Sequence, residues 1–237
     1  MDPQYGNLYL IPCPIGDTPP LEVLPLLVKK AVEEIDHYIV EDEKNARRFI
    51  KSLVPRKSQP NLHFEIINKF TNPSEIPEML NPCLEGVDIG VISDAGCPGI
   101  ADPGAAVVAE AHAKGIKVVP LVGPSSILLA MMASGFNGQN FAFNGYLPID
   151  KKERKSEIKR LERLSKEQDQ SQLFIETPYR NNQILESLAN TLHPQTQLCV
   201  ACDITLSSEY IKTQTAEGWK RTKVDLNKRP TLFIIQK

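Results

Sequence analysis

The chain has 237 residues, of which 41% are hydrophobic and 24% are charged. It can therefore bury one large core or two smaller ones and is neither disordered nor fibrous. The 27 Lys and Arg residues nearly balance the 29 Asp and Glu residues, for a net charge of -2. This balance excludes a global basic field that would draw the whole protein to nucleic acid, although a local basic patch remains open.

The cysteine count and the apolar runs of the sequence bear on the redox state of the thiols and on the compartment of the protein. The five cysteines are odd in number, which favours reduced thiols over a disulfide framework or a zinc site. The start, MDPQYGNLYL, has no basic segment followed by an apolar one, and no apolar run reaches the length of a membrane span. We therefore expect a cytoplasmic protein with no membrane partner.

Apolar, β-branched runs alternate with helical patterns through the first half of the chain. Strands are predicted over residues 8–11, 37–40, 62–67, 88–92 and 117–121. Helices are predicted over residues 25–35, 43–53, 74–84 and 105–113. Such alternation predicts parallel βαβ units.

The second half of the chain contains a highly charged segment, residues 150–170. Ile158, Leu161 and Leu164 form one apolar stripe in it, which favours a solvated helix that leans on a sheet. The alternative is an RNA-facing basic surface, made of Lys151, Lys152, Arg154, Lys155, Lys159, Arg160 and Arg163. Further strands are predicted over residues 173–175, 198–201 and 231–235 and near Tyr210, with a helix over 181–192. We predict two α/β domains, residues 1–120 and 121–237.

Four unusual segments each follow a predicted strand. They are IPCPIGD (11–17), VEDEKNARRFIKSL (40–53), VISDAGCPGIADPGA (91–105) and LVGPSSILLAMMASG (121–135). Parallel sheets bind ligands beyond the carboxyl ends of their strands, so these segments are predicted to meet one ligand. The chain has no GxGxxG after the first strand, no GxxxxGK[ST] and no HExxH, so nicotinamide, ATP and zinc-protease chemistry lack support.

These motifs, with FNGYLP (143–148) and LFIETPYR (173–180), occur in an order that resembles the tetrapyrrole methylase superfamily of S-adenosylmethionine-dependent methyltransferases. The resemblance runs from about residue 7 to residue 212 and is greatest to the branch that contains the ribosomal small-subunit RNA 2′-O-ribose methyltransferase. It implies a two-domain α/β fold of the tetrapyrrole methylase type, with the cofactor S-adenosylmethionine in a cleft between the domains. It also implies a homodimer.

The same resemblance implies a set of cofactor-binding residues. They are Pro14, Ala95, Gly96, Cys97, Ile100, Ser125, Ser126 and Glu176. Ser125 or Ser126 could equally be a helix N-cap, which is the commonest use of serine at such a position. The region 203–205 is implied near the adenosine, less securely.

Methyl transfer from a sulfonium is an in-line displacement, so the enzyme mainly aligns the reacting atoms and excludes water. No metal is required. A ribose hydroxyl must lose its proton, and the carboxylates in the right loops are Glu41, Asp42, Asp94 and Asp102. Each of them also has a plain structural use as a helix cap or a loop brace, so the base stays open.

The substrate is less well defined than the cofactor. The branch usually reads EDTRxTRxLL and ARELTK, whereas this chain has EDEKNARRFI and ACDITL, with Cys202 and Leu206 in place of basic residues. Fewer phosphate-positioning charges weaken the case for a ribosomal RNA acceptor. Three hypotheses remain: an RNA ribose methyltransferase, a methyltransferase of the same fold acting on a tetrapyrrole or another non-RNA acceptor, and a non-catalytic nucleotide-binding module.

Overall fold

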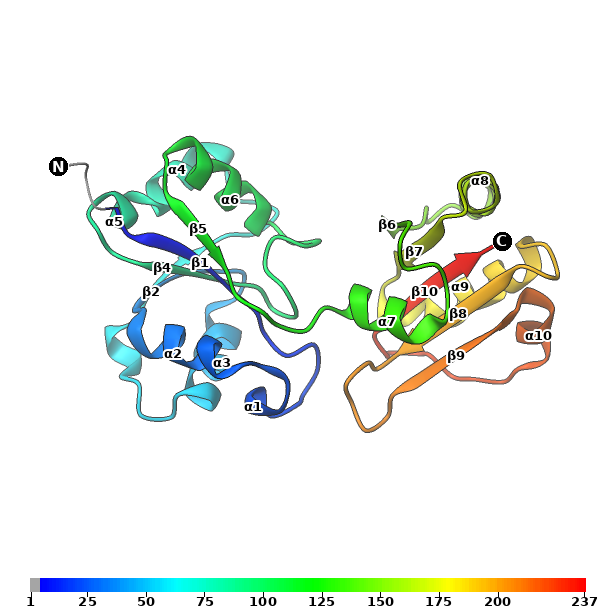
Figure 1. Ribbon diagram of the computed structural model, residues 1–237, viewed down its shortest axis with the longest axis horizontal. Helices are drawn as coiled ribbons and strands as arrows, with labels where there is room; N and C mark the ends of the chain where they lie inside the picture. Colours follow the sequence, from blue (N-terminus) through cyan, green and yellow to red (C-terminus); the bar gives the residue numbers. More distant parts are fainter. Residues whose placement is uncertain (1–4) are drawn as a thin grey trace. The chain divides into compact units, whose positions relative to one another are not determined.

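The computed structural model describes residues 5–237. The first four residues, which belong to the predicted domain 1–120 and to the start considered above, lie outside the described part. The chain divides into two compact units, Met1–Ser125 and Ser126–Lys237 (Figure 1). No helix within residues 5–237 is both long and apolar enough to cross a membrane.

Unit 1 is built on a five-stranded parallel sheet in the order β3-β2-β4-β1-β5. The strands are β1 (Asn7–Ile11), β2 (His37–Val40), β3 (His63–Ile66), β4 (Ile89–Ile92) and β5 (Lys117–Pro120). The helices are α1 (Pro20–Val23), α2 (Leu26–Glu34), α3 (Glu43–Leu53), α4 (Ile76–Met79), α5 (Asn81–Leu84) and α6 (Gly104–Ala113). The predicted parallel arrangement is confirmed here.

Helices cover both faces of this sheet. Val28 and Val32 of α2 and Ile50 of α3 belong to one buried cluster, while Val107 and Ala111 of α6 belong to the cluster on the other face. The connections after β1 and β2 therefore leave the sheet on one side and the connection after β4 leaves on the other. A crevice at the carboxyl ends of adjacent strands is expected at such a switch point.

The prediction of one continuous helix over residues 74–84 is wrong. A 3-10 turn (Pro73–Glu75), α4 and α5 replace it, with Leu80 between the two short helices. Pro77 and Pro82 account for the break, because proline has no N–H to donate and its ring collides with the carbonyl four residues earlier. Apolar spacing alone did not reveal this.

Unit 2 is built on a second sheet, in the order β6-β7-β10-β8-β9. Its strands are β6 (Phe141–Tyr146), β7 (Ser171–Ile175), β8 (Gln197–Cys202), β9 (Tyr210–Thr215) and β10 (Thr231–Gln236). Its helices are α7 (Ser126–Ser134), α8 (Lys151–Gln168), α9 (Asn181–Thr191) and α10 (Ala216–Arg221). The parallel pattern stops here, since β10 runs antiparallel to both of its neighbours and β9 antiparallel to β8. The strand β6 and the helix α10 were not predicted from the sequence.

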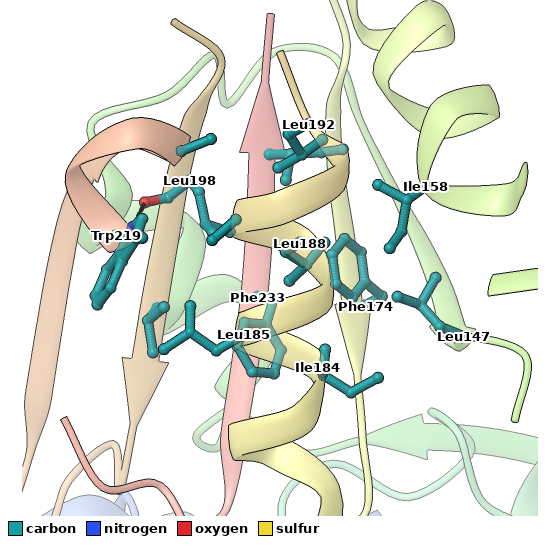
Figure 2. Packing of buried hydrophobic residues seen from close by; sticks show 14 of the residues in the cluster. Leu147, Ile158, Phe174, Ile184, Leu185, Leu188, Leu192, Leu198, Trp219 and Phe233 are labelled. Carbon is teal, nitrogen blue, oxygen red and sulfur yellow. Dashed lines mark hydrogen bonds between the residues drawn. The ribbon is translucent and has the colours of Figure 1, made fainter. Parts of the chain in front are cut away.

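The larger core of unit 2 lies between the sheet and the helices α8, α9 and α10. Figure 2 shows Ile158 of α8, Leu188 of α9 and Phe174 and Phe233 of the sheet in this core. The Trp219 indole of α10 donates to the Leu198 carbonyl at 2.8 Å, so its polar atom is paired although the ring is buried. The apolar stripe of α8 therefore faces the sheet as predicted, with Leu164 half-buried. The charged side of the helix is largely exposed.

The opposite face of the sheet in unit 2 is packed against α7. Phe136, Phe141 and Phe143 lie against the cluster that contains Ala130 and Met131 of this helix. Cys199 and Cys202 have the spacing of a C-x-x-C motif, but Cys199 belongs to this cluster and Cys202 to the one opposite. Residues an odd number of positions apart on a strand point to opposite faces of the sheet. The two thiols therefore lie apart, each packed in its own core.

Candidate functional site

The carboxyl ends of β1, β4 and β2 are level with one another in unit 1. Ile11 pairs with Ile92, and Ile92 pairs with Val40. The residues that directly follow β1, β4 and β2 therefore leave the sheet side by side at the same edge. Three of the four segments singled out in the sequence begin at this edge.

The loop VISDAGCPGIADPGA is braced from inside by Asp102. Its carboxylate accepts the Gly99 N–H at 2.8 and 2.9 Å and the Gly104 N–H at 2.7 Å. Gly96 and Gly99 have φ angles of 71° and 83°, and Ala101 has 62°, a region that L residues with a side chain rarely adopt. The loop is thus a fixed structure, and Asp102 has a structural role in it.

Contacts of the main chain join this loop to its two neighbours. Cys13 and Gly96 exchange N–H to carbonyl hydrogen bonds of 2.9 and 3.2 Å. The Cys97 thiol donates to the Pro124 carbonyl at 3.3 Å. Gly123 lies so close to Pro12 that an added Cβ would be 2.2 Å from the Cβ of the proline. The loops after β1, β4 and β5 therefore form one rigid assembly within unit 1.

A pocket of about 700 Å³ opens beside this assembly. It is lined by residues 13–20 after β1, by Asp42, Asn45, Ala46, Arg48, Phe49 and Ser52 at the start and along α3, and by Ile92, Ser93 and Asp94. The predicted cofactor residue Pro14 is among them. Phe49 and Ser52 were missed in the sequence, although Asn45, Phe49 and Ser52 follow the helical spacing of one face.

The four candidate carboxylates have different surroundings. Asp42 accepts the Asn45 N–H at 2.7 Å and so caps α3. Asp94 is exposed, lines the pocket, and accepts the Asn45 side-chain amide at 3.2 Å. Asn45 in turn accepts a guanidinium N–H of Arg48 at 3.3 Å. The network leaves Asp94 open to the pocket and holds its carboxylate in place.

Glu41 supports the same loop from below. Its carboxylate accepts the Asp94 backbone N–H at 3.1 Å. Burial raises the pKa of Glu41 above its ordinary value, and the nearby carboxylates of Asp102 and Asp94 add to the effect, against the hydrogen bond from Asp94. Of the four candidates, Asp94 is the one that neither a helix cap nor a bond to loop backbone accounts for.

The cap formed by Asp42 permits a direct check of its role. Asp42→Ala should destabilise unit 1 by about 1 kcal/mol, because one backbone N–H at the start of α3 loses its acceptor. The turnover number at saturating substrate should change by less than about threefold, because the Asp42 carboxylate is already engaged as the cap of α3. Denaturation midpoints and turnover of the same preparation measure both. A loss of turnover far beyond the loss of stability would return Asp42 to the list of bases.

The remaining cofactor candidates of unit 1 differ in exposure. Ala95 is exposed and Ile100 is 55% exposed, whereas Cys97 is half-buried. Ser125 is half-buried at the end of this unit, and Ser126 is the first residue of α7. Gly96, between Ala95 and Cys97, is buried, and both of its backbone polar groups bond to Cys13.

In unit 2, Glu176 follows β7 and is buried, with a side-chain exposure of 0%. One carboxylate oxygen, Oε1, accepts the Thr177 N–H at 2.6 Å and an Arg180 N–H at 2.5 Å. The other, Oε2, is one of the few buried side-chain atoms in the described residues without a hydrogen-bond partner. An unpaired buried carboxylate oxygen is costly.

The ACDITL segment forms a second polar cluster in unit 2. Asp203 accepts Arg229 Nε at 2.7 Å and the Ser208 hydroxyl at 2.8 Å. Asp203 and Thr205 have φ angles of 51° and 74°, and the Thr205 N–H donates to Glu209 at 2.9 Å. These contacts hold the unusual backbone of the loop.

Fold and site together define an α/β protein with a ligand site at the carboxyl ends of parallel strands. The family model for tetrapyrrole (corrin/porphyrin) methylases matches residues 7–218. Two similar relatives are both named "Ribosomal RNA small subunit methyltransferase I". The Bacillus subtilis protein is 32% identical over 217 residues, 90% of this chain and 70% of its own length. The Thermotoga maritima protein is 30% identical over 214 residues, 90% of each chain.

Solved structures show the same fold. The methyltransferase CobJ aligns with a TM-score of 0.65 at 17% identity, covering 98% of this chain and 94% of its own. Uroporphyrin-III C-methyltransferase from Thermus thermophilus, complexed with S-adenosyl homocysteine, aligns with a TM-score of 0.57 at 16% identity, covering 98% of each chain. The chain belongs to the tetrapyrrole methylase family. It is an S-adenosylmethionine-dependent methyltransferase.

Proposed function

We propose that this methyltransferase modifies the 2′-hydroxyl of a ribose in the RNA of the small ribosomal subunit. The observation that carries the proposal is the open carboxylate of Asp94, held at the edge of a 700 Å³ pocket beside the braced loop. Relatives that align with 90% of this chain are named for small-subunit ribosomal RNA, which supports RNA as the acceptor. The site of action would then be the cytoplasm, where ribosomal subunits are made, and the enzyme a homodimer as in the family it resembles.

The loops of unit 1 fit the cofactor chemically. The methionine part of S-adenosylmethionine carries an ammonium and a carboxylate, which need hydrogen-bonding main chain at close approach. Ala95 is exposed and can offer such backbone, while Gly96, with its positive φ and its N–H and carbonyl bonded to Cys13, holds the turn beside it. The proposed cofactor residues are Pro14, Ala95, Gly96, Cys97, Ile100, Ser125, Ser126 and Glu176.

In the reaction, S-adenosylmethionine supplies a methyl group on a positively charged sulfur. Asp94 Oδ2 accepts the proton of the ribose hydroxyl, while Asn45 holds Oδ1 and fixes the direction of the carboxylate. Glu41 fixes the backbone of Asp94 through its N–H. The rigid loop assembly keeps these groups aligned, which is the main task in a displacement of this kind.

A second acceptor class has one observation in its favour. The pocket contains the carboxylates of Asp17, Asp42 and Asp94 against the single guanidinium of Arg48, together with Phe49 and several prolines. Carboxylates repel phosphate groups, and an apolar lining suits a largely apolar acceptor. A non-RNA acceptor such as a tetrapyrrole is therefore the competing proposal.

One experiment decides between these proposals. The protein is titrated with S-adenosylmethionine by calorimetry, then incubated with labelled cofactor and an extract from a strain that lacks the gene. We expect binding in the calorimeter and label in small-subunit RNA at a 2′-O-methyl position, located by alkaline-resistant dinucleotides. Label in small molecules or in protein contradicts the RNA proposal and supports the competing, non-RNA acceptor. Binding without any labelled fraction supports a non-catalytic nucleotide-binding module.

A further inference from the structure

The first two turns of α8 contain cations that have no acidic partner. Lys151, Lys152, Arg154 and Lys155 form no ion pair within the described residues. Further along the same helix, Arg160 pairs with Glu157 at 2.6 Å and Arg163 pairs with Glu167 at 4.0 Å. The unpaired cations are therefore concentrated at one end of the helix.

That end is the unfavourable one for positive charge. The N-terminus of a helix bears a partial positive charge, so lysine and arginine there destabilise the helix, whereas aspartate and glutamate stabilise it. Asp150 and Glu153 offset part of this effect, since Asp150 caps the helix through the N–H groups of Lys152 and Glu153. The four cations nevertheless outnumber the two acids.

Arg154 is the most informative of the four. It is 3% exposed, and its guanidinium donates to the Ile149 carbonyl at 3.1 Å, which is neutral. The guanidinium forms no ion pair, and only the more distant charge of Asp150 acts on it, so it pays a desolvation cost that one carbonyl does not offset. Such a group is well placed to receive an anion.

A groove of about 270 Å³ receives these side chains. It is lined by Lys151, Arg154, Lys155 and Ile158 of α8 and by Gln183, Glu186, Ser187, Asn190 and Thr191 of α9. Ile158 lines the groove and also belongs to the core with Ile184 and Leu188 of α9 (Figure 2). The two helices are thereby held together, and their outer polar side chains form the walls. Three cations face one carboxylate, Glu186, beside amide and hydroxyl groups that donate to phosphate oxygens.

We propose that the groove between α8 and α9, named here the α8–α9 groove, binds a phosphodiester of the RNA acceptor. The inference rests on the proposed function in that the acceptor is RNA. The carboxylates of the pocket in unit 1 repel phosphates, so that pocket is poorly suited to hold the RNA backbone. In the proposal, the cations of the α8–α9 groove hold the backbone instead. Backbone contacts of this kind position an RNA without reading its sequence.

The test compares RNA binding by three proteins. The groove variant is Lys151→Glu/Lys155→Glu, and the control variant is Lys212→Glu/Lys223→Glu, which makes the same change of charge at exposed positions of unit 2 outside the groove. Binding of a labelled small-subunit RNA fragment is measured by fluorescence anisotropy at several salt concentrations. Cofactor affinity and methyl transfer to the same RNA are measured in parallel.

We expect the groove variant to bind RNA about tenfold or more weakly than the control variant at low salt, with a salt dependence less steep by about 1.4, the value for two lost phosphate contacts on a single strand. Its cofactor affinity should be unchanged. Lys151→Glu places an acid in the first turn of α8, which favours the helix, so weaker RNA binding with unchanged or higher thermal stability cannot be attributed to misfolding.

The two proposals fail in different ways. If the wild-type protein neither binds nor methylates RNA, the proposed function is wrong. If the wild-type protein methylates RNA and the groove variant matches the control variant in affinity and salt dependence, the assignment of the α8–α9 groove is wrong while the proposed function stands.

Discussion

Gly123→Ala should lower the affinity for S-adenosylmethionine by about tenfold to hundredfold. The new Cβ would lie 2.2 and 2.3 Å from two atoms of the Pro12 ring, which is too rigid to move aside. Either the loop after β5 or the loop after β1 must shift, at a cost of about 1–3 kcal/mol. The same shift removes the Pro124 carbonyl from the Cys97 thiol, so the loop that we propose to hold the cofactor loses one of its supports.

The matched control for this variant is Gly138→Ala. A Cβ at Gly138 would meet no atom within 4 Å, so the change in stability should stay within about 0.5 kcal/mol. Calorimetric titration with S-adenosylmethionine and thermal denaturation measure both variants. A Gly123→Ala protein that is destabilised but binds the cofactor with unchanged affinity would show that the three joined loops are not the cofactor site.

Asp94→Asn should reduce the turnover number by about 10²- to 10⁴-fold, the usual contribution of a positioned general base. An asparagine oxygen can still accept the Asn45 amide, and the backbone contact with Glu41 does not involve the side chain. The geometry of the loop is therefore retained while the proton acceptor is lost. Cofactor affinity should change by less than about threefold. Single-turnover methyl transfer at saturating cofactor and acceptor measures the effect.

Asp102→Asn provides the contrast. A carboxylate serves the N–H groups of Gly99 and Gly104, whereas an asparagine has one acceptor oxygen and brings an N–H₂ group toward the same donors. The expected result is a loss of about 1–3 kcal/mol in stability and weaker cofactor binding, with a smaller effect on the saturated rate than Asp94→Asn. If Asp94→Asn retains the wild-type rate, the proton is accepted elsewhere, and Glu41→Gln becomes the informative variant because the pKa of Glu41 is raised.

Local chemistry explains where prediction from sequence succeeded. The helix over residues 43–53 and the strand over residues 37–40 were predicted with the bounds that the structure shows. In both, the apolar pattern is bounded by residues that act on the neighbouring backbone. Asp42 lies between the strand and the helix and caps the helix, and Pro55 follows shortly after the helix ends. The failures are local as well. Prolines divided the predicted helix of residues 74–84. Gly145, with φ of 65°, interrupts the pairing of β6 with β7, and the segment was therefore not predicted to be a strand.

The sequence by itself determined the classes of element, the segments that carry chemistry and the resemblance from which the cofactor follows. These depend on residue type and spacing along the chain, which are local properties. It did not determine the use of each carboxylate. Asp42, Asp94 and Asp102 are alike as residues in polar loops, and their hydrogen-bond partners alone distinguish a cap, an open group and a brace.

The tertiary structure also decided which cations are paired. Arg154 and Arg160 both belong to the charged segment 150–170, and nothing in their spacing separates them. The structure places Arg160 beside Glu157 on the exposed side of α8 and buries Arg154 against α9 without an acid. Burial and partner come from packing between segments far apart in the chain, and these set the energy of a charge. For that reason the charged helix, for which the sequence left a solvated face and an RNA-facing surface open, contains at one end the site that we propose for an anion.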